Sequence, residues 1–348
     1  MTAAPTSDLS LPSGVRPSDA TRAITEAAAV LRAGGLVAFP TETVYGLGAD
    51  ACNDDALRKI FELKGRPANH PLILHLASLE ELPQWVAEVP ESARQLALAF
   101  WPGPLTLVLP RHPAVSKVLT GGQDSIAVRV PTHPVAQALL RAFGSGIAAP
   151  SANRYGHVSP TTSSHVRDEF GDAVTVLEGG DCEVGLESTI LSLLESTPRI
   201  LRPGRIQAAD MEHVLAQPVL GHSTTHSSLP RVPGSTVQHY APSTPLSLVT
   251  REALASEIER ANALGQPVAV LARHPRSAEG LAACGAAPPF VLAWVTASAS
   301  AAGFAHELYA RLRELDKVGA HRILVERVPD EPAWEAVRDR LQRAAAGR

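Results

Sequence analysis

The stretch at residues 39–51 reads FPTETVYGLGADA and leaves a strand in an unusual way. The apolar run Leu36–Phe39 is typical of a strand, and Pro40 ends it because proline has no backbone N–H for a sheet ladder. Two threonines and a glutamate follow, and then Gly46 and Gly48, which allow other backbone or a ligand to approach closely. A cluster of polar residues and glycines directly after a strand calls for an explanation, which the motifs further along the chain supply.

Length and composition indicate an ordinary globular protein of two domains. The chain has 348 residues, which favours more than one hydrophobic core, and 45% of them are hydrophobic. We expect no membrane helix, because no apolar run reaches about 18 residues. Residues 1–19 are polar and rich in proline and serine, so we expect a flexible N-terminal tail rather than a secretory signal.

Charge and cysteine usage argue against several classes of protein. The formal net charge of −4 disfavours a protein that grips nucleic acid mainly by electrostatics. The cysteines, Cys52, Cys182 and Cys284, are far apart and form no CxxC pair, which predicts neither a zinc site nor a disulfide framework. A chain of this kind is expected in the cytoplasm, where thiols stay reduced.

Hydrophobic periodicity predicts alternating strands and helices over residues 20–207, the pattern of an α/β fold. Helices are expected at residues 20–33, 54–64, 79–100, 133–143 and 161–170. Strands are expected at residues 36–39, 72–76, 105–109, 126–130, 146–149, 174–177, 189–194 and 199–202. The alternation favours one domain over this range.

A linker is expected at residues 208–244, because residues 216–245 are dense in Pro, Gly, Ser, Thr and His and show little apolar periodicity. A smaller C-terminal α/β domain is expected at residues 245–348. Its predicted strands are 246–249, 267–271 and 322–327, and its predicted helices are 252–264, 302–315 and 332–345. It contains no GxGxxG sequence, so a dinucleotide site has no support.

Two cations stand close together at the end of the helix predicted for residues 54–64. Lys64 lies on the apolar side of the last turn, Gly65 is a C-cap, and Pro67 prevents continuation, so Arg66 stands on a rigid corner. One interpretation is a lysine that simply interacts favourably with the helix dipole. The other is a pair of cations that bind a polyanion such as nucleotide phosphates.

Short polar residues follow the strand predicted at residues 146–149. Ser151 and Asn153 lie at its carboxyl end, where α/β sheets bind ligands. The run Ser159-Pro160-Thr161 is typical of a helix N-terminus, which attracts anions. The alternative interpretation is a capped loop without a ligand.

Two further arginines lie in predicted strands. Arg129 shares one face of its strand with Ala127, and a buried arginine there needs a carboxylate or phosphate partner, whereas on a solvated face it is a surface residue. Arg202 ends a strand before Pro-Gly. The run VGLESTILSL at residues 184–193 places Glu187 and Ser188 directly before another strand, where a plain turn is the alternative.

The order of these motifs resembles one known family. The chain contains, in sequence, PTETVYGLG, KGRP, HPLILH, WPGPLT, VRVP, PSAN, GLEST and LRPG. This order and spacing resemble the YrdC-like family. With PGSTVQHYAP and a second α/β domain, the resemblance is to its two-domain form, the threonylcarbamoyl-AMP synthases. It covers residues 20–206 strongly and the C-terminal domain loosely.

The resemblance implies a fold and an activity. The fold would be a twisted, open, mixed sheet with helices around a concave pocket, followed by a small Rossmann-like domain. The chain would join L-threonine, bicarbonate and ATP into threonylcarbamoyl-AMP and release pyrophosphate, with Mg2+ accompanying ATP and no dedicated protein cage for the metal. The product would pass to a tRNA threonylcarbamoyl transferase complex that modifies the adenosine next to the anticodon, and stable tRNA binding would not be required.

The resemblance also implies roles for the matching residues, and no metal ligand is among them. The catalytic set would be Lys64, Arg66, Ser151 and Asn153. The ATP-binding residues would be Lys64, Arg66, Ser125, Ser151, Asn153, Ser159 and Arg202. The threonine-binding residues would be Thr41, His75, Arg129 and Ser188.

The linker would fold over the active site, with His239 and Tyr240 as its lid residues. The family's linker usually carries an aromatic and a basic residue between PG and HYAP, where this chain has Ser235-Thr236-Val237-Gln238. This departure leaves a contact between the linker and ATP open. Serine also stays open as a substrate, because one methyl group contributes only about 1–3 kcal/mol of discrimination.

Two rival functions are compatible with parts of the sequence. A double-stranded RNA-binding or scaffold module could use the same fold, although the net charge and the complete set of motifs weigh against it. A carbamoyl-transferring maturation enzyme with a YrdC-like domain would need zinc-finger cysteines, and three isolated cysteines cannot form a CxxC pair.

Overall fold

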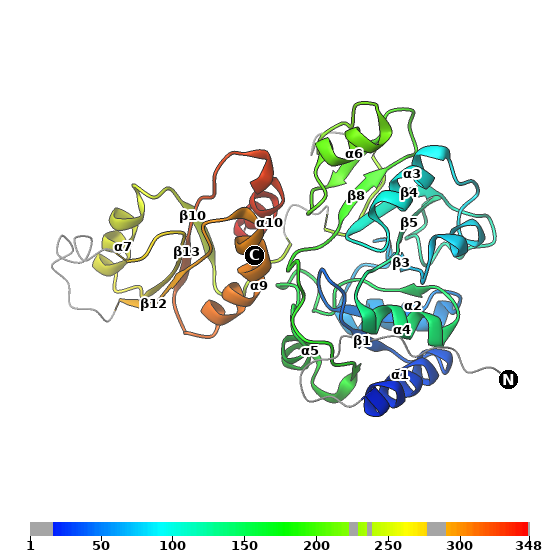
Figure 1. Ribbon diagram of the computed structural model, residues 1–348. Coiled ribbons are helices and arrows are strands. Elements are labelled where there is room, and N and C mark those ends of the chain that lie inside the picture. The colour runs from blue at the N-terminus through cyan, green and yellow to red at the C-terminus, as the bar shows by residue number, and fades with distance from the viewer. Residues whose placement is uncertain (1–16, 223–228, 235–238, 277–289, 347–348) are drawn as a thin grey trace.

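The structure is a computed structural model that describes residues 17–222, 229–234, 239–276 and 290–346. In this part of the chain, two sheets form the centres of two units (Figure 1). The larger unit has a nine-stranded mixed sheet, and the smaller unit has a four-stranded parallel sheet. This arrangement confirms the predicted α/β class.

The strands of the larger sheet include parallel and antiparallel pairs, as in the pairs β3–β5 and β4–β5 respectively. In chain order they are β1 (Val37–Phe39), β2 (Gly46–Asp50), β3 (Ile73–His75), β4 (Leu105–Pro110), β5 (Ser125–Arg129), β6 (Ile147–Ala148), β7 (Thr175–Val176), β8 (Thr189–Ser192) and β9 (Arg199–Arg202). Their order across the sheet is β7-β1-β2-β6-β3-β5-β4-β8-β9.

Helices cover both faces of this sheet. They are α1 (Pro17–Arg32), α2 (Asp54–Lys64), α3 (Glu91–Phe100), α4 (Pro134–Phe143), α5 (Ser163–Phe170) and α6 (Ala208–Leu215), with the short 3-10 helices η1 (Leu79–Gln84) and η2 (Gly171–Ala173). Side chains of α1 and α4 share one core cluster with Val37 and Phe39 of β1. Side chains of α2 and α3 belong to another cluster, together with Leu74 of β3 and Val128 of β5.

Helix α2 agrees with its predicted range, because its end signals are strong. The side chain of Asn53 accepts hydrogen bonds from the backbone N–H groups of Asp55 and Ala56, which caps the first turn. Gly65 ends the helix in the left-handed conformation at φ 63°, which glycine adopts without a steric penalty. Lys64 is therefore the last helical residue, and Arg66 lies beyond the cap.

Side-chain alternation in β5 separates the two faces of the sheet. Ile126 and Val128 pack in the cluster that contains α2 and α3, whereas Ala127 packs with Ile73 of β3 on the opposite face. Arg129 lies near Ile73 and His75 in the lining of one pocket. The face of the sheet that carries Ala127 and Ile73 therefore also carries these polar residues, and it is the face toward the linker.

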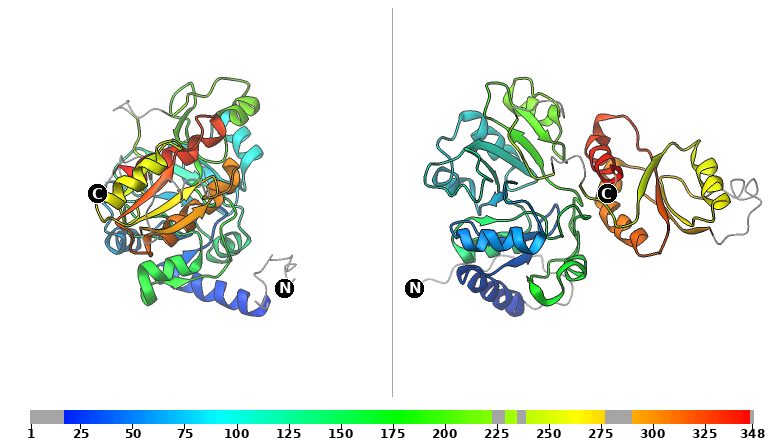
Figure 2. Two further views of the ribbon diagram at one scale, coloured as in Figure 1. Left: turned by 90° about the vertical axis from the view of Figure 1, so that its left-hand side faces the viewer. Right: turned by 180° about the vertical axis from the view of Figure 1, so that it is seen from behind.

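The smaller unit repeats the α/β pattern on a reduced scale. Its strands are β10 (Leu246–Val249), β11 (Val268–Ala272), β12 (Val291–Thr296) and β13 (Arg322–Glu326), in the order β10-β13-β11-β12. Its helices are α7 (Leu254–Ala263), α9 (Ala301–Asp316) and α10 (Glu335–Ala345), with the 3-10 helix η3 (Pro332–Trp334). Figures 1 and 2 show α9 and α10 on the side toward the larger unit and α7 on the far side.

Several predicted boundaries differ from the structure. The helix predicted at 79–100 is wrong, because η1 and α3 are separate and prolines at positions 83 and 90 interrupt the helical hydrogen bonds. Helix α1 begins at Pro17, inside the predicted tail, and residues 1–16 lie outside the described residues. Helix α6 occupies the first eight residues of the predicted linker.

Strands β2 and β12 were not predicted from the sequence. The glycine-rich sequence GLGAD of β2 lacks the β-branched residues that usually mark a strand. None of the described helices is long and apolar enough to cross a membrane.

Candidate active site

One pocket lies where strand ends of the larger sheet meet the linker. Its empty volume, which includes open solvent at its mouth, is ≈ 510 Å³. Three arginines line it, Arg66, Arg129 and Arg202, and each is at most 6% exposed. Arg129 and Arg202 end β5 and β9, so the sheet itself brings two of these cations together.

Arg129 is buried in the pocket wall, and the surface interpretation of this residue is therefore wrong. Its Nη2 lies 2.6 Å from Oε1 of Glu42, and its Nη1 donates to Oγ1 of Thr43 at 2.8 Å. Its Nε donates to the carbonyl of Gly103 at 3.2 Å. The ion pair offsets the cost of burying two charges. A guanidinium in this setting can also bind the carboxylate of a ligand through two parallel hydrogen bonds.

The segment after β1 is shaped by the hydroxyl group of Thr41. Oγ1 of Thr41 donates to the carbonyl of Val44 at 2.7 Å and accepts from the N–H groups of Thr43 and Val44 at 3.2 Å each. These bonds close a tight turn that a threonine side chain can stabilise. Thr41 lies in the pocket lining, but its hydroxyl group is occupied, and Thr43 is the residue that contacts Arg129.

Arg202 connects the segment before β8 to the linker. Its Nε and Nη2 donate to the carbonyl of Ser188 at 3.1 and 2.9 Å, and Nη2 also donates to the hydroxyl of Ser188 at 3.1 Å. Its Nη1 donates to the carbonyl of Pro233 at 3.0 Å. The resemblance assigned Arg202 to ATP and Ser188 to threonine, and the structure places the two side chains in direct contact.

His75 lies beside Arg129 in the pocket lining. Burial, and then the charge of Arg129, lowers the pKa of His75 to about 3, so the imidazole is neutral at pH 7. Its Nδ1 has no hydrogen-bond partner among the described residues. This ring nitrogen can therefore form a hydrogen bond with a ligand.

Lys64 lies behind the pocket wall rather than in it. Its ammonium donates to the backbone carbonyls of Ser151, at 2.6 Å, and of Asn153. The side chain is 3% exposed, and burial, and then the charge of Arg66, holds the pKa of Lys64 well below its usual value. Lys64 therefore holds the loop that carries Ser151 into the pocket lining.

Arg66 is the cation of this pair that faces the pocket. Its Nη2 donates to the carbonyl of Pro71 at 2.9 Å, and its guanidinium lies 5.8 Å from the ring centre of Tyr155. Its Nε is buried and has no hydrogen-bond partner in the described part of the chain. Burial lowers the pKa of Arg66 to about 10, which leaves the group charged at pH 7.

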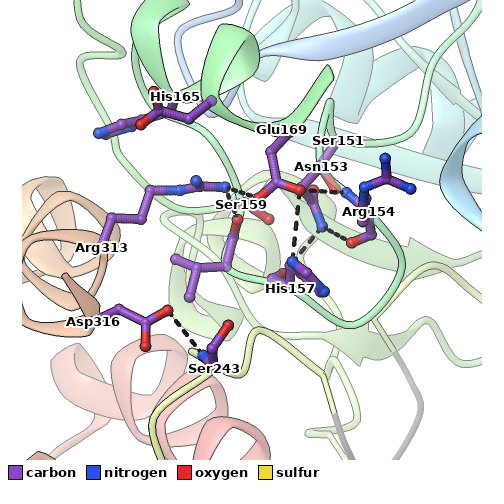
Figure 3. A network of polar contacts seen from close by, with 12 residues as sticks. Ser151, Asn153, Arg154, His157, Ser159, His165, Glu169, Ser243, Arg313 and Asp316 are labelled. Atoms are coloured by element: carbon purple, nitrogen blue, oxygen red, sulfur yellow. Dashed lines mark hydrogen bonds and ion pairs between the residues drawn. The ribbon is translucent and has the colours of Figure 1, made fainter. Parts of the chain in front are cut away.

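The loop that follows β6 is held by its own amide and by the smaller unit (Figure 3). Nδ2 of Asn153 donates to the carbonyls of Arg154 and His157 at 2.7 and 3.0 Å. Glu169 of α5 accepts from the N–H of Arg154 at 3.0 Å and from the guanidinium of Arg313, in α9, at 2.8 Å. Asn153 thus shapes the loop, and its Oδ1 is buried without a hydrogen-bond partner among the described residues.

Ser125 and Ser159, like Lys64 and Asn153, were assigned to the nucleotide but lie outside the pocket lining. The predicted helix cap at Ser159 is wrong, because Thr162 caps α5 and the hydroxyl of Ser159 donates to Oε1 of Glu187 at 2.6 Å. A hydrogen bond to a carboxylate stabilises a buried hydroxyl group more than a contact with a helix end that already has a cap. Ser125 begins β5, at the opposite end from Arg129.

Both predicted lid residues line the pocket. The Nδ1 of His239 accepts the backbone N–H of Tyr240 at 3.0 Å, and burial lowers the pKa of His239 to about 3. Tyr240 is 1% exposed, and its hydroxyl group has no hydrogen-bond partner among the residues that the structure describes. The linker residues 235–238, on which a contact with ATP depends, lie outside the described residues.

Sequence reasoning gave no role to four residues of this site. They are Glu42, Thr43, Tyr155 and Glu187. Glu42 and Glu187 are buried carboxylates in PTET and GLEST, and a glutamate among small and apolar neighbours next to a strand was the available signal. No comparable sequence signal marked Tyr155, because the residues that it contacts are distant along the chain.

Comparisons with known proteins identify both units. A family model named Sua5_yciO_yrdC and described as "Telomere recombination" matches residues 29–204. A second one, described as "Threonylcarbamoyl-AMP synthase, C-terminal domain", matches residues 206–346. The two matches together span both sheets.

Similar proteins occur in distant organisms. A threonylcarbamoyl-AMP synthase of Pyrococcus abyssi is 40% identical over 334 residues, which cover 92% of this chain and 94% of the relative. One of Bacillus subtilis is 40% identical over 334 residues, with 93% of each chain covered. The crystal structure of P. abyssi Sua5 complexed with L-threonine superposes with a TM-score of 0.84 at 38% identity and covers 92% of this chain and 94% of that one. The chain therefore belongs to the threonylcarbamoyl-AMP synthase family.

Proposed function

We propose that this chain synthesises threonylcarbamoyl-AMP from L-threonine, bicarbonate and ATP, with release of pyrophosphate. The observation that carries the proposal is the buried Arg129 in a pocket that also contains Arg66 and Arg202. One guanidinium suits the carboxylate of an amino acid, and the others suit the phosphates of a nucleotide. Similarity to Sua5 complexed with L-threonine over 92% of the chain supports the assignment of the amino acid.

On the threonine side, we propose that Arg129 pairs with the substrate carboxylate. Thr43 and Glu42 already contact its guanidinium, so they hold it in place and are the groups that the substrate displaces or shares. Thr41, His75 and Ser188 complete this side of the site. The unpaired Nδ1 of His75 and the turn built on Thr41 support this arrangement.

On the nucleotide side, we propose that Arg66 contacts the phosphates directly. Lys64 affects them indirectly, through its charge and through the loop that it holds. Ser151 lines the pocket on that loop, while Asn153 maintains its shape. Ser125, Ser159 and Arg202 remain the further candidates for ATP. Cations held in place before the reaction stabilise the charge that develops on the leaving pyrophosphate.

The chemistry requires two bond-forming steps. The amine of threonine attacks bicarbonate and gives an N-carboxy intermediate with loss of water. A carboxylate oxygen of this intermediate then attacks the α-phosphorus of ATP, and the bond from that phosphorus to the bridging oxygen of pyrophosphate breaks. The side chains named above orient the reactants and stabilise charge, and none of them needs to form a covalent bond.

Magnesium is proposed only as the counterion of ATP. The described residues contain no group of three or more His, Cys, Asp or Glu side chains that could hold a metal ion. Glu187, the carboxylate in the pocket lining, already accepts three hydrogen bonds from Ser159, Tyr309 and Arg340. A magnesium ion bound through phosphate oxygens and water fits this donor set, because Mg2+ retains several waters and needs few protein ligands.

We further propose that the product passes to a tRNA threonylcarbamoyl transferase complex, which modifies the adenosine next to the anticodon. This assignment follows from the family alone. A carbamate is unstable in water, so the lid residues His239 and Tyr240 at the pocket are expected to shield the intermediate.

The deciding experiment measures pyrophosphate release with ATP and Mg2+, with and without L-threonine and bicarbonate. Wild type is compared with Arg66→Met, which removes a cation of the pocket, and with Arg58→Met, which removes an exposed arginine of α2. We expect release that needs both substrates and is lost only in Arg66→Met. Absence of release from wild type, together with RNA binding that weakens steeply with salt, would establish the RNA-binding alternative instead.

A further inference from the structure

The smaller unit packs against the pocket wall through an apolar cluster. Val158 and Leu186 of the larger unit share this cluster with Phe304, Leu308 and Leu341 of α9 and α10. The approach is close enough to require glycine in GLEST, at Gly185. A Cβ atom at that position would lie 2.2 Å from the backbone oxygen of His306, and the φ of Gly185 is +75°.

Within this interface, the smaller unit supplies two of the three hydrogen bonds of a carboxylate in the pocket lining. Oε2 of Glu187 accepts from the hydroxyl of Tyr309 at 2.9 Å and from Nε of Arg340 at 2.9 Å. Oε1 accepts from Ser159 at 2.6 Å. Tyr309 is 0% exposed. The orientation of this carboxylate is therefore set mainly from outside the larger sheet.

Arg340 joins the carboxylate to the linker. Its guanidinium lies 5.2 Å from the ring centre of Tyr240, and its Nη1 donates to Asp339 at 2.6 Å. The ring of Tyr240 also stacks on that of Tyr309, with 5.7 Å between centres and 27° between planes. Arg340 is 0% exposed, so its ion pair with Glu187 is shielded from bulk water. One cation thus contacts both a pocket carboxylate and a lid residue.

The electrostatics agree with this geometry. Burial opposes ionisation of Glu187, but the guanidinium groups of Arg340 and Arg202 outweigh it and lower the pKa of Glu187 to about 2. A buried carboxylate that loses its cation keeps the cost of desolvation without compensation. Glu187 directly precedes Ser188, which Arg202 holds. A displaced Glu187 would therefore disturb the threonine side of the pocket.

A second contact from the same unit reaches the nucleotide loop. Arg313 of α9 donates to Glu169 and to the carbonyl of Val158, and Glu169 in turn accepts the N–H of Arg154 (Figure 3). The smaller unit thus supports the pocket at two places, the segment before β8 and the loop after β6.

We propose that Arg340 and Tyr309 are positioning residues of the active site, which act through Glu187 and Tyr240 and make the smaller unit part of the pocket wall. The proposal rests on the proposed function only where pyrophosphate release is the readout. It assigns α9 and α10 a direct effect on substrate binding, beyond holding two folded units together.

The test uses full-length Tyr309→Phe, Arg340→Lys, Arg340→Met and Glu187→Gln, each confirmed as folded by thermal unfolding. The matched control is Lys317→Met, which removes an exposed ion pair between the same two units, at 2.7 Å from Asp168. For each variant, kcat and KM for threonine and ATP are measured, and the dissociation constants of L-threonine and ATP are measured by calorimetry.

We expect Arg340→Met and Tyr309→Phe to lower kcat/KM for threonine about tenfold or more, the size of one lost hydrogen bond to a charged group. Arg340→Lys should recover part of the loss, and Lys317→Met should behave as wild type. In the Glu187→Gln background, Arg340→Met should cost less than in wild type, because the two residues act as one unit.

A folded Arg340→Met within twofold of wild type, or losses that add fully in the double variant, would overturn the proposal. If Arg340→Met does not fold, Tyr309→Phe decides, because it removes a single oxygen atom. A wild-type chain without threonine-dependent release would refute the proposed function. The calorimetric constants would then decide this inference, and unchanged ligand binding in Tyr309→Phe would overturn it.

Discussion

Replacing Lys64 by methionine distinguishes two roles of its ammonium group. In the structure, Nζ of Lys64 binds the carbonyls of Ser151 and Asn153, so the partners of the cation lie within the protein. If these bonds hold the loop, the variant loses stability even without added nucleotide. If the ammonium serves only ATP, the variant keeps its stability or gains some, because a buried cation has been removed.

The structure indicates the size of the effect. A hydrogen bond to a charged group contributes about 1.5–3 kcal/mol, so two contribute about 3–6 kcal/mol. Substitution by methionine offsets part of this loss of stability, because it also removes the cost of burying a charge. Burial already disfavours the charged form of Lys64, as its lowered pKa indicates. We expect a net loss of about 3 kcal/mol, which lowers the midpoint of thermal unfolding by about 6–12 °C for a unit of this size.

The assay is thermal unfolding without nucleotide, followed by pyrophosphate release at a temperature where both proteins are folded. Lys59→Met is the matched control, because Lys59 is an exposed lysine of the same helix that donates to the carbonyl of Gly34 at 2.7 Å. It should change stability by less than about 1 kcal/mol. A Lys64→Met protein that unfolds at or above the wild-type midpoint would refute the loop-holding role.

Three further predictions follow from buried groups. Glu187 has a pKa of about 2, below its usual value, so its ion pair stabilises the fold above the unfolded pKa of about 4.5 and is lost as pH falls toward 2. The difference in unfolding midpoint between wild type and Glu187→Gln should therefore shrink from about pH 6 to about pH 3, and a constant difference would contradict it. Gly185→Ala should lower the midpoint by an amount that reflects more than about 2 kcal/mol, because its Cβ would meet the backbone of His306 in a left-handed conformation, and an unchanged midpoint would exclude this contact. Arg129→Met should cost about 3–5 kcal/mol in urea unfolding by leaving Glu42 buried without its cation, and adding Glu42→Gln should restore most of it. A double variant no more stable than the single one would show that the pair is not the cause.

Elements whose signals are local can be predicted from the amino-acid sequence alone. Helix α2 has the predicted range, because Asn53 and Gly65 cap it and its apolar residues recur at helical spacing. The motifs at residues 41, 66, 129, 151 and 202 were found because polar residues next to apolar strands, or just beyond a helix cap in the case of Arg66, are visible in the chain itself. The structure places all five in one pocket lining. The family followed from the order of such motifs.

The contacts between side chains, in contrast, follow from the packing of the folded chain. Lys64 and Arg66 are two positions apart in the motif, yet one holds a loop and the other faces the pocket, because the cap at Gly65 turns the chain between them. Strand β2 lacks a strand-like sequence and forms because β1 and β6 offer it partners on both sides. The contact between Glu187 and Arg340 joins residues 153 positions apart. No local pattern encodes such a pair, since its stability comes from burial that exists only once the two units have packed together.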